Sequence, residues 1–83
     1  MKTARLTIPE WAVCPLEYGD RSGITEREEA LLDAFEAMLD AFAKQEGLKG
    51  YWFDWDDQHF FHWKNDLSDE GGMCVSCTVH WED

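Results

Sequence analysis

Basic residues are scarce in this sequence. Its 83 residues include 7 lysines and arginines against 18 aspartates and glutamates, which gives a net charge of −11. Contacts with DNA, RNA and anionic membranes depend on clustered lysine and arginine, so this balance argues against direct binding to any of them. A surplus of acids fits a basic partner or cations, although it also serves solubility alone.

Proline and long apolar runs are also lacking. The chain has 2 prolines, yet it is 45% hydrophobic and 14% aromatic, which is typical of a folded protein. The first eight residues are polar-interrupted, unlike a signal peptide, and no apolar run approaches the length of a membrane span. Three cysteines in such a chain are expected to be reduced thiols in a cytoplasm. We expect one domain over residues 1–83, because this length supports one modest core and no separate catalytic and substrate domains.

The first half of the sequence predicts one strand and two helices. Residues 3–8 alternate between apolar and polar side chains, as in a half-buried strand. Pro9 suits the start of a short helix over residues 10–16, which Pro15 disturbs or ends. A Thr25-x-x-Glu28 capping box and Gly47 bound one amphipathic helix over residues 26–46.

The second half predicts three strands. Residues 51–56, 59–64 and 73–81 alternate in the manner of strands, and Asp57-Gln58 is expected to form a hairpin turn between the first two. The order β-α-α-β-β-β predicts an α+β fold: a four-stranded, mostly antiparallel sheet with the long helix packed across one face and the short helix after the first strand.

The long helix carries a row of acids beside its apolar face. Successive members are 3, 4, 3 and 4 residues apart, so the row extends over roughly 21 Å, and it comprises Glu26, Glu29, Asp33, Glu36 and Asp40. Like charges at this spacing cost a helix a few tenths of a kcal/mol per pair. The row is either an ordinary solvated face or a set of carboxylates that imitates nucleic-acid phosphates and complements a basic groove.

A second group of acids lies near the expected hairpin turn, at Asp54, Asp56 and Asp57. Their spacing is similar to the start of a calcium-binding loop, but the glycine and the closing glutamate that such a loop needs are missing. We therefore treat these three as secondary partner-binding residues and expect no metal there.

The pair Cys74-x-x-Cys77, followed by His80, raises the alternative of a zinc protein. In an extended strand, residues 74 and 77 point to opposite faces, and no second pair of close ligands is present. We expect a buried Cys77 and a half-exposed Cys74 instead.

Catalysis has little support in the sequence. His59, His62 and His80 are the only side chains suited to proton transfer near neutral pH without a perturbed pKa. No nucleophile motif, glycine-rich phosphate loop or metalloprotease helix accompanies them. We expect no enzyme and no cofactor.

Large aromatic residues offer another way to bind a protein. Trp52 and Phe60, with Tyr18 or Trp11, exceed what one small core needs. Exposed members of this set could act as interface anchors.

The segments Ile8-Pro9-Glu10-Trp11-Ala12 and Tyr18-Gly19-Asp20-Arg21-Ser22-Gly23-Ile24-Thr25 carry a resemblance to a known group. With a C-terminal strand that holds two cysteines, the chain resembles short acidic proteins of bacteriophages and mobile elements that share an IPEWA…GDxSG pattern. By size, charge and single-domain form it is also similar to anti-CRISPR proteins, several of which imitate DNA. The resemblance implies residence in the cytoplasm of a bacterial host.

These observations lead to one main hypothesis: an acidic, monomeric inhibitor that binds a basic nucleic-acid-binding protein, with a CRISPR surveillance complex as the specific candidate. The alternatives are an interaction module that docks through aromatics on the sheet, and a small zinc-binding protein.

Overall fold

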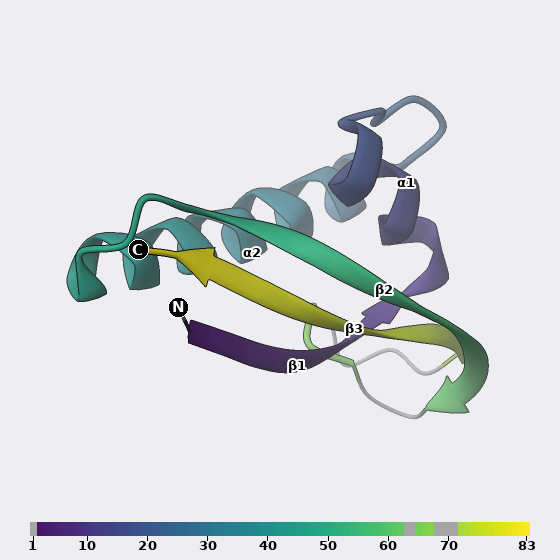
Figure 1. Ribbon diagram of the computed structural model, residues 1–83. Helices are drawn as coiled ribbons and strands as arrows, with labels where there is room; N and C mark the ends of the chain where they lie inside the picture. Colours follow the sequence, from purple (N-terminus) through teal and green to yellow (C-terminus); the bar gives the residue numbers. More distant parts are fainter. Residues whose placement is uncertain (1, 63–64, 68–71) are drawn as a thin grey trace.

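The computed structural model describes residues 2–62, 65–67 and 72–83, without the side chains of residues 56–62. The described elements are β1 (Lys2–Pro9), α1 (Glu10–Tyr18), α2 (Glu26–Glu46), β2 (Gly50–His62) and β3 (Gly72–Glu82). Both outer strands pair antiparallel with β3, so the sheet has the order β1-β3-β2. The two helices lie on one face of this sheet (Figure 1).

The prediction of four strands is wrong. The described sheet has three strands, because β2 continues through the expected Asp57-Gln58 turn and pairs with β3 along both of its halves. The register passes from Trp55 opposite Cys77 to His59 opposite Val75, so the extra residues of β2 form an irregularity of the β-bulge kind. A two-residue hairpin turn needs positive φ angles, which favour glycine or asparagine, and this segment has neither. A bulge absorbs extra residues without reversing the chain.

The helix α2 has the predicted bounds, and its predicted caps are confirmed. Thr25 Oγ1 accepts a hydrogen bond from the Glu28 backbone N–H at 3.1 Å, and Glu28 Oε1 accepts one from the Thr25 N–H at 2.9 Å. Gly47 ends the helix in the left-handed conformation, with φ of 70°.

The helix α1 is longer than predicted. It continues through Pro15 and ends at Gly19, whose φ is 74°. The φ of proline is fixed at a helical value, but proline has no N–H to donate to the preceding turn, so the helix continues through Pro15 with one hydrogen bond fewer.

The core lies between α2 and the sheet. The helix buries Leu32, Phe35, Leu39 and Ala43 against a cluster that includes Ile8, Ala12, Cys77, Val79 and Trp81. The Trp81 indole also donates a hydrogen bond to the Leu39 carbonyl at 3.2 Å, which ties β3 to the middle of the helix. Burial of one such leucine stabilises the fold by about 1.5–3 kcal/mol. Because the apolar face of α2 must therefore point to the sheet, the remaining sides of the helix face solvent.

Burial at the start of β3 differs from the prediction. The alternation of residues 73–81 with Cys77 inside predicts an inward Met73, but Met73 is 38% exposed, and Cys74, expected to be half-exposed, is buried. Both residues lie beyond the bulge, where strands bend and twist more strongly than in a regular ladder. Simple alternation therefore fails for this end of the strand.

The second face of the sheet carries no helix in the described part of the chain. Register pairing brings Thr3, His80 and Trp52 into one row across the strands, and Arg5, Thr78 and Asp54 into the next. Antiparallel sheets commonly leave one face to water in this way. We call this surface the open sheet face.

Neither α1 nor α2, the two helices of the described residues, is apolar over enough of its length to cross a bilayer.

Candidate partner-binding surface

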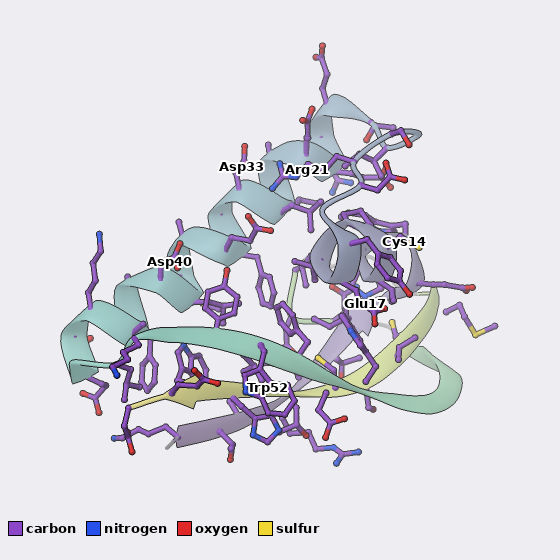
Figure 2. All side chains as sticks on the ribbon, turned by 45° about the horizontal axis from the view of Figure 1, so that its top comes forward. Cys14, Glu17, Arg21, Asp33, Asp40 and Trp52 are labelled. Carbon is purple, nitrogen blue, oxygen red and sulfur yellow. The ribbon has the colours of Figure 1, made fainter. Side chains whose placement is uncertain are left out.

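The acid row of α2 lies beside the apolar face that packs into the core. Glu26, Glu29, Asp33 and Asp40 are exposed, and Glu36 is half-buried. Figure 2 shows Asp33 and Asp40 on α2, on the helix side of the sheet. The capping box and the buried apolar face fix the rotation of the helix, so the backbone positions of these five acids are fixed on one side of it. We call this surface the acid row.

One arginine interrupts the acid row. Arg21 Nη1 lies 2.6 Å from Asp33 Oδ1, and Arg21 Nη2 lies 3.2 Å from Glu36 Oε2. Its hydrogen bond to Asp33 raises the pKa of the guanidinium, and the charges of Asp33, Glu36 and Glu29 add to this, although burial opposes it. The positive charge of Arg21 therefore offsets part of the negative charge in the middle of the row, at Asp33 and Glu36. Its ion pairs do not include the acids at the two ends of the row.

Local turn chemistry places Arg21. The Asp20 carboxylate accepts hydrogen bonds from the backbone N–H of Ser22 at 3.0 Å and from its hydroxyl at 2.6 Å. Because both bonds favour the charged form, they lower the pKa of Asp20. Gly19 and Gly23 flank this turn with positive φ angles, which side chains disfavour. The two glycines of residues 19–23 are typical of a turn, but nothing in the sequence indicates that Arg21 reaches across to α2.

A cleft of about 290 Å³ lies between α1 and β2. Leu16 and Glu17 of α1 line it, together with Tyr51, Trp52, Phe53 and Trp55 of β2. Figure 2 shows Glu17 on the side of α1 toward β2. The alternation of residues 51–56 places Tyr51, Phe53 and Trp55 on one face of a strand. They are only half-buried, so part of this aromatic face remains accessible. We call this site the aromatic cleft.

The charges of the acid row reach the aromatic cleft. Burial raises the pKa of the Tyr51 phenol, and the negative charges of Asp40 and Glu36 raise it further. The carboxylates of α2 therefore act electrostatically on a ring that lines the cleft.

Asp54 does not join this surface. It lies on the open sheet face, with its Oδ2 atom 3.9 Å from Nε2 of His80. The Trp52 indole stacks on the His80 ring there, with centroids 4.2 Å apart and an interplanar angle of 11°. The sheet separates Asp54 from α2, so the two predicted groups of acids are not one site. Asp56 and Asp57 belong to β2, and their side chains lie outside the described residues.

The cysteines offer no metal centre among the described residues. No three acidic, histidine or cysteine side chains gather there in a way that could hold an ion. Cys74 and Cys77 are both buried, and burial raises the pKa of the Cys74 thiol. A raised pKa disfavours the thiolate, which is the form that binds metals and attacks disulfides.

The exposed aromatic residues are scattered. Trp52 is 44% exposed on the open sheet face, and Tyr18 is 73% exposed at the end of α1. Trp11 packs against the core, and the side chain of Phe60 lies outside the described residues. Among the aromatic residues that were expected to act as anchors and whose side chains the structure describes, Trp52 is the one that is exposed on the open sheet face.

No protein family, no curated protein and no solved structure matches this chain.

Proposed function

We propose that this protein binds a basic surface of a nucleic-acid-binding protein through the acid row of α2 and thereby competes with nucleic acid. The observation that carries the proposal is the exposure of Glu26, Glu29, Asp33 and Asp40 along one flank of a helix that the core holds in place. The helix is already formed, so binding does not have to order its backbone, and complementary charge speeds encounter with a basic partner.

The candidate partner is a CRISPR surveillance complex, because the small size and net charge of −11 are similar to those of anti-CRISPR proteins. The basic channel of such a complex binds nucleic acid through its backbone, which is the group that carboxylates imitate. The row matches phosphates only in charge, since phosphates are about 3.4 Å apart along one strand, and Arg21 offsets part of the charge at its centre.

The test uses two variants that change the net charge equally. E26K/E29K/D40K reverses three charges of the row and keeps both ion-pair partners of Arg21. E10K/D54K/E82K reverses two glutamates and one aspartate elsewhere on the exposed surface. Each variant takes the net charge from −11 to −5, because three negative charges become three positive ones.

The assay is binding to a purified CRISPR surveillance complex, with target DNA as competitor and a series of salt concentrations. We expect wild-type binding that excludes DNA and weakens with salt, and a loss of roughly 100-fold in E26K/E29K/D40K, at about 1 kcal/mol per reversed charge. The control should lose far less. Equal losses in the two variants would mean that net charge alone acts, and wild-type protein that binds no such complex would contradict the choice of partner. Circular dichroism establishes that both variants fold.

A second candidate function rests on Trp52. Its exposed indole, stacked on His80, could anchor a protein partner on the open sheet face. Trp52→Ala distinguishes the two candidates: it should abolish binding by this route, and it should leave binding through the acid row intact.

A further inference from the structure

The floor of the aromatic cleft is a ladder of three rings on β2. Tyr51 and Phe53 meet edge to face at a centroid distance of 5.7 Å, and Phe53 and Trp55 stack at 5.3 Å with 28° between their planes. All three rings are half-buried, so each is packed on one side and accessible on another. The faces of such rings carry negative partial charge, which attracts cations.

Carboxylates of two helices act on the cleft. Glu17 of α1 lines it. The pKa of the Tyr51 phenol is raised mainly by burial, and the charges of Asp40 and Glu36 on α2 add to this. Glu36 is paired with Arg21. Neither Glu17 nor Asp40 has an ion-pair partner among the residues that the structure describes. The cleft therefore combines accessible aromatic rings with one unneutralised carboxylate in its lining, Glu17, and the charge of Asp40 acts on it from α2.

Among common cations, the guanidinium group fits this combination best. It is planar, stacks on aromatic rings, is more weakly hydrated than an ammonium group and donates hydrogen bonds to carboxylates. The cleft volume of about 290 Å³ lies near the lower end of the range for ligand sites, which begins at about 300 Å³. A site of this size suits one side chain.

We propose that the aromatic cleft binds an arginine side chain of a partner protein, which lies along the rings of Tyr51, Phe53 and Trp55 with its guanidinium group near the carboxylate of Glu17, and that the charge of Asp40 on α2 strengthens this binding. The identity of that partner as a basic protein rests on the proposed function. Recognition of arginine by the cleft is a property of this chain alone, and it can be measured without the partner.

The primary experiment compares three short peptides that differ at one position: arginine, its uncharged analogue citrulline, and lysine. Each is titrated into the uniformly ¹⁵N-labelled protein at low salt, and amide and indole NMR signals are followed. We expect the arginine peptide to bind roughly 5- to 30-fold more tightly than the citrulline peptide, with lysine between them. The shifts should centre on residues 16–17, on 51–55 and on the Trp55 indole. Equal binding of arginine and citrulline, or shifts centred on the acid row away from the cleft, would overturn the proposal.

Two matched pairs of variants locate the site. Tyr51→Leu removes a ring of the cleft, whereas Tyr18→Leu removes an exposed ring that does not line it. Asp40→Asn removes a carboxylate whose charge acts on the cleft, whereas Asp54→Asn removes one on the other face of the sheet. We expect about 5-fold weaker arginine binding in Tyr51→Leu and Asp40→Asn, and less than twofold change in the controls. If Tyr51→Leu does not fold, the comparison of Asp40→Asn with Asp54→Asn still tests the proposal. Equal changes in arginine-peptide affinity in these two variants would contradict it.

The same variants separate the two proposals. If Tyr51→Leu folds and binds the surveillance complex normally while E26K/E29K/D40K does not, the acid row functions and arginine capture by the cleft is wrong for that partner. If arginine peptides bind the cleft while no surveillance complex is bound, the cleft inference stands and the choice of partner fails.

Discussion

Replacement of Arg21 by glutamine should lower stability and raise affinity for a basic partner at the same time. The guanidinium makes two ion pairs with α2, at 2.6 Å to Asp33 and 3.2 Å to Glu36. The side chain of Asp33 is 70% exposed, so these are surface pairs. The two pairs share one guanidinium group, so we assign them together the contribution of one exposed ion pair, about 0.2–1 kcal/mol. With an unfolding entropy of about 2.1 cal/mol/K per residue, 1 kcal/mol in a chain of this length corresponds to about 6 °C. We expect Tm to fall by about 1–6 °C in Arg21→Gln at low salt, and by less in 1 M salt.

The expected gain in affinity has a separate cause. Arg21→Gln removes the positive charge that offsets the centre of the acid row, and one unit charge at about 4 Å contributes about 1 kcal/mol in water. Binding of a decalysine peptide, measured by fluorescence anisotropy at low salt, should therefore tighten about 5-fold. A general loss of structure would weaken binding instead, so the opposite directions of the two effects distinguish the mechanism from misfolding.

Arg27→Gln is the matched control, because it removes the same charge from an exposed position in the first turn of α2. It should tighten binding less than Arg21→Gln does. Equal tightening in the two variants would show that net charge matters and the position of Arg21 does not. Weaker binding in Arg21→Gln would refute the idea that this residue offsets the row.

Two further predictions concern the fold and the cleft. Thr25→Ala removes the hydroxyl that accepts a hydrogen bond from the Glu28 N–H, so the free energy of unfolding, measured by urea denaturation, should fall by about 1 kcal/mol. Thr25→Ser keeps a hydroxyl and should retain most of that stability. An unchanged free energy of unfolding in Thr25→Ala would mean that water replaces the cap without loss. The raised pKa of Tyr51 means that folding favours its protonated form, so this contribution to stability is complete below about pH 10 and is lost as the pH rises through the higher folded-state pKa. Tyr51→Phe should reduce the decline in Tm above pH 10, and absorbance near 295 nm should show one tyrosine fewer titrating late; identical pH profiles for the two proteins would contradict this.

Local signals predicted much of the fold. The capping box at Thr25 and the glycine at position 47 gave the bounds of α2, because backbone groups at helix ends need partners that nearby residues supply. The alternation of apolar and polar side chains predicted β1 and the middle of β3. The division of residues 51–64 into two strands was wrong, since alternation is the same in one long strand and in two strands joined by a turn.

The candidate surface was likewise predictable from the sequence only in part. The spacing of the five acids on α2 follows from helix geometry and could be read from the sequence. The contact from Arg21 to Asp33 joins residues 12 apart through a turn, and the cleft joins α1 to β2 across more than 30 residues. Neither arrangement follows from spacing along the chain.

The sequence by itself therefore determined the charge of this protein, its helices and the acid row, because each depends on composition or on periods of a few residues. Only the tertiary structure decided that β2 is one strand, that Asp54 lies on the opposite face of the sheet from the row, that Arg21 offsets the centre of the row, and that Tyr51, Phe53 and Trp55 line a cleft between α1 and β2. These features depend on how strands pair and how helices pack on them, and such contacts are set by the burial of apolar faces that are distant in sequence.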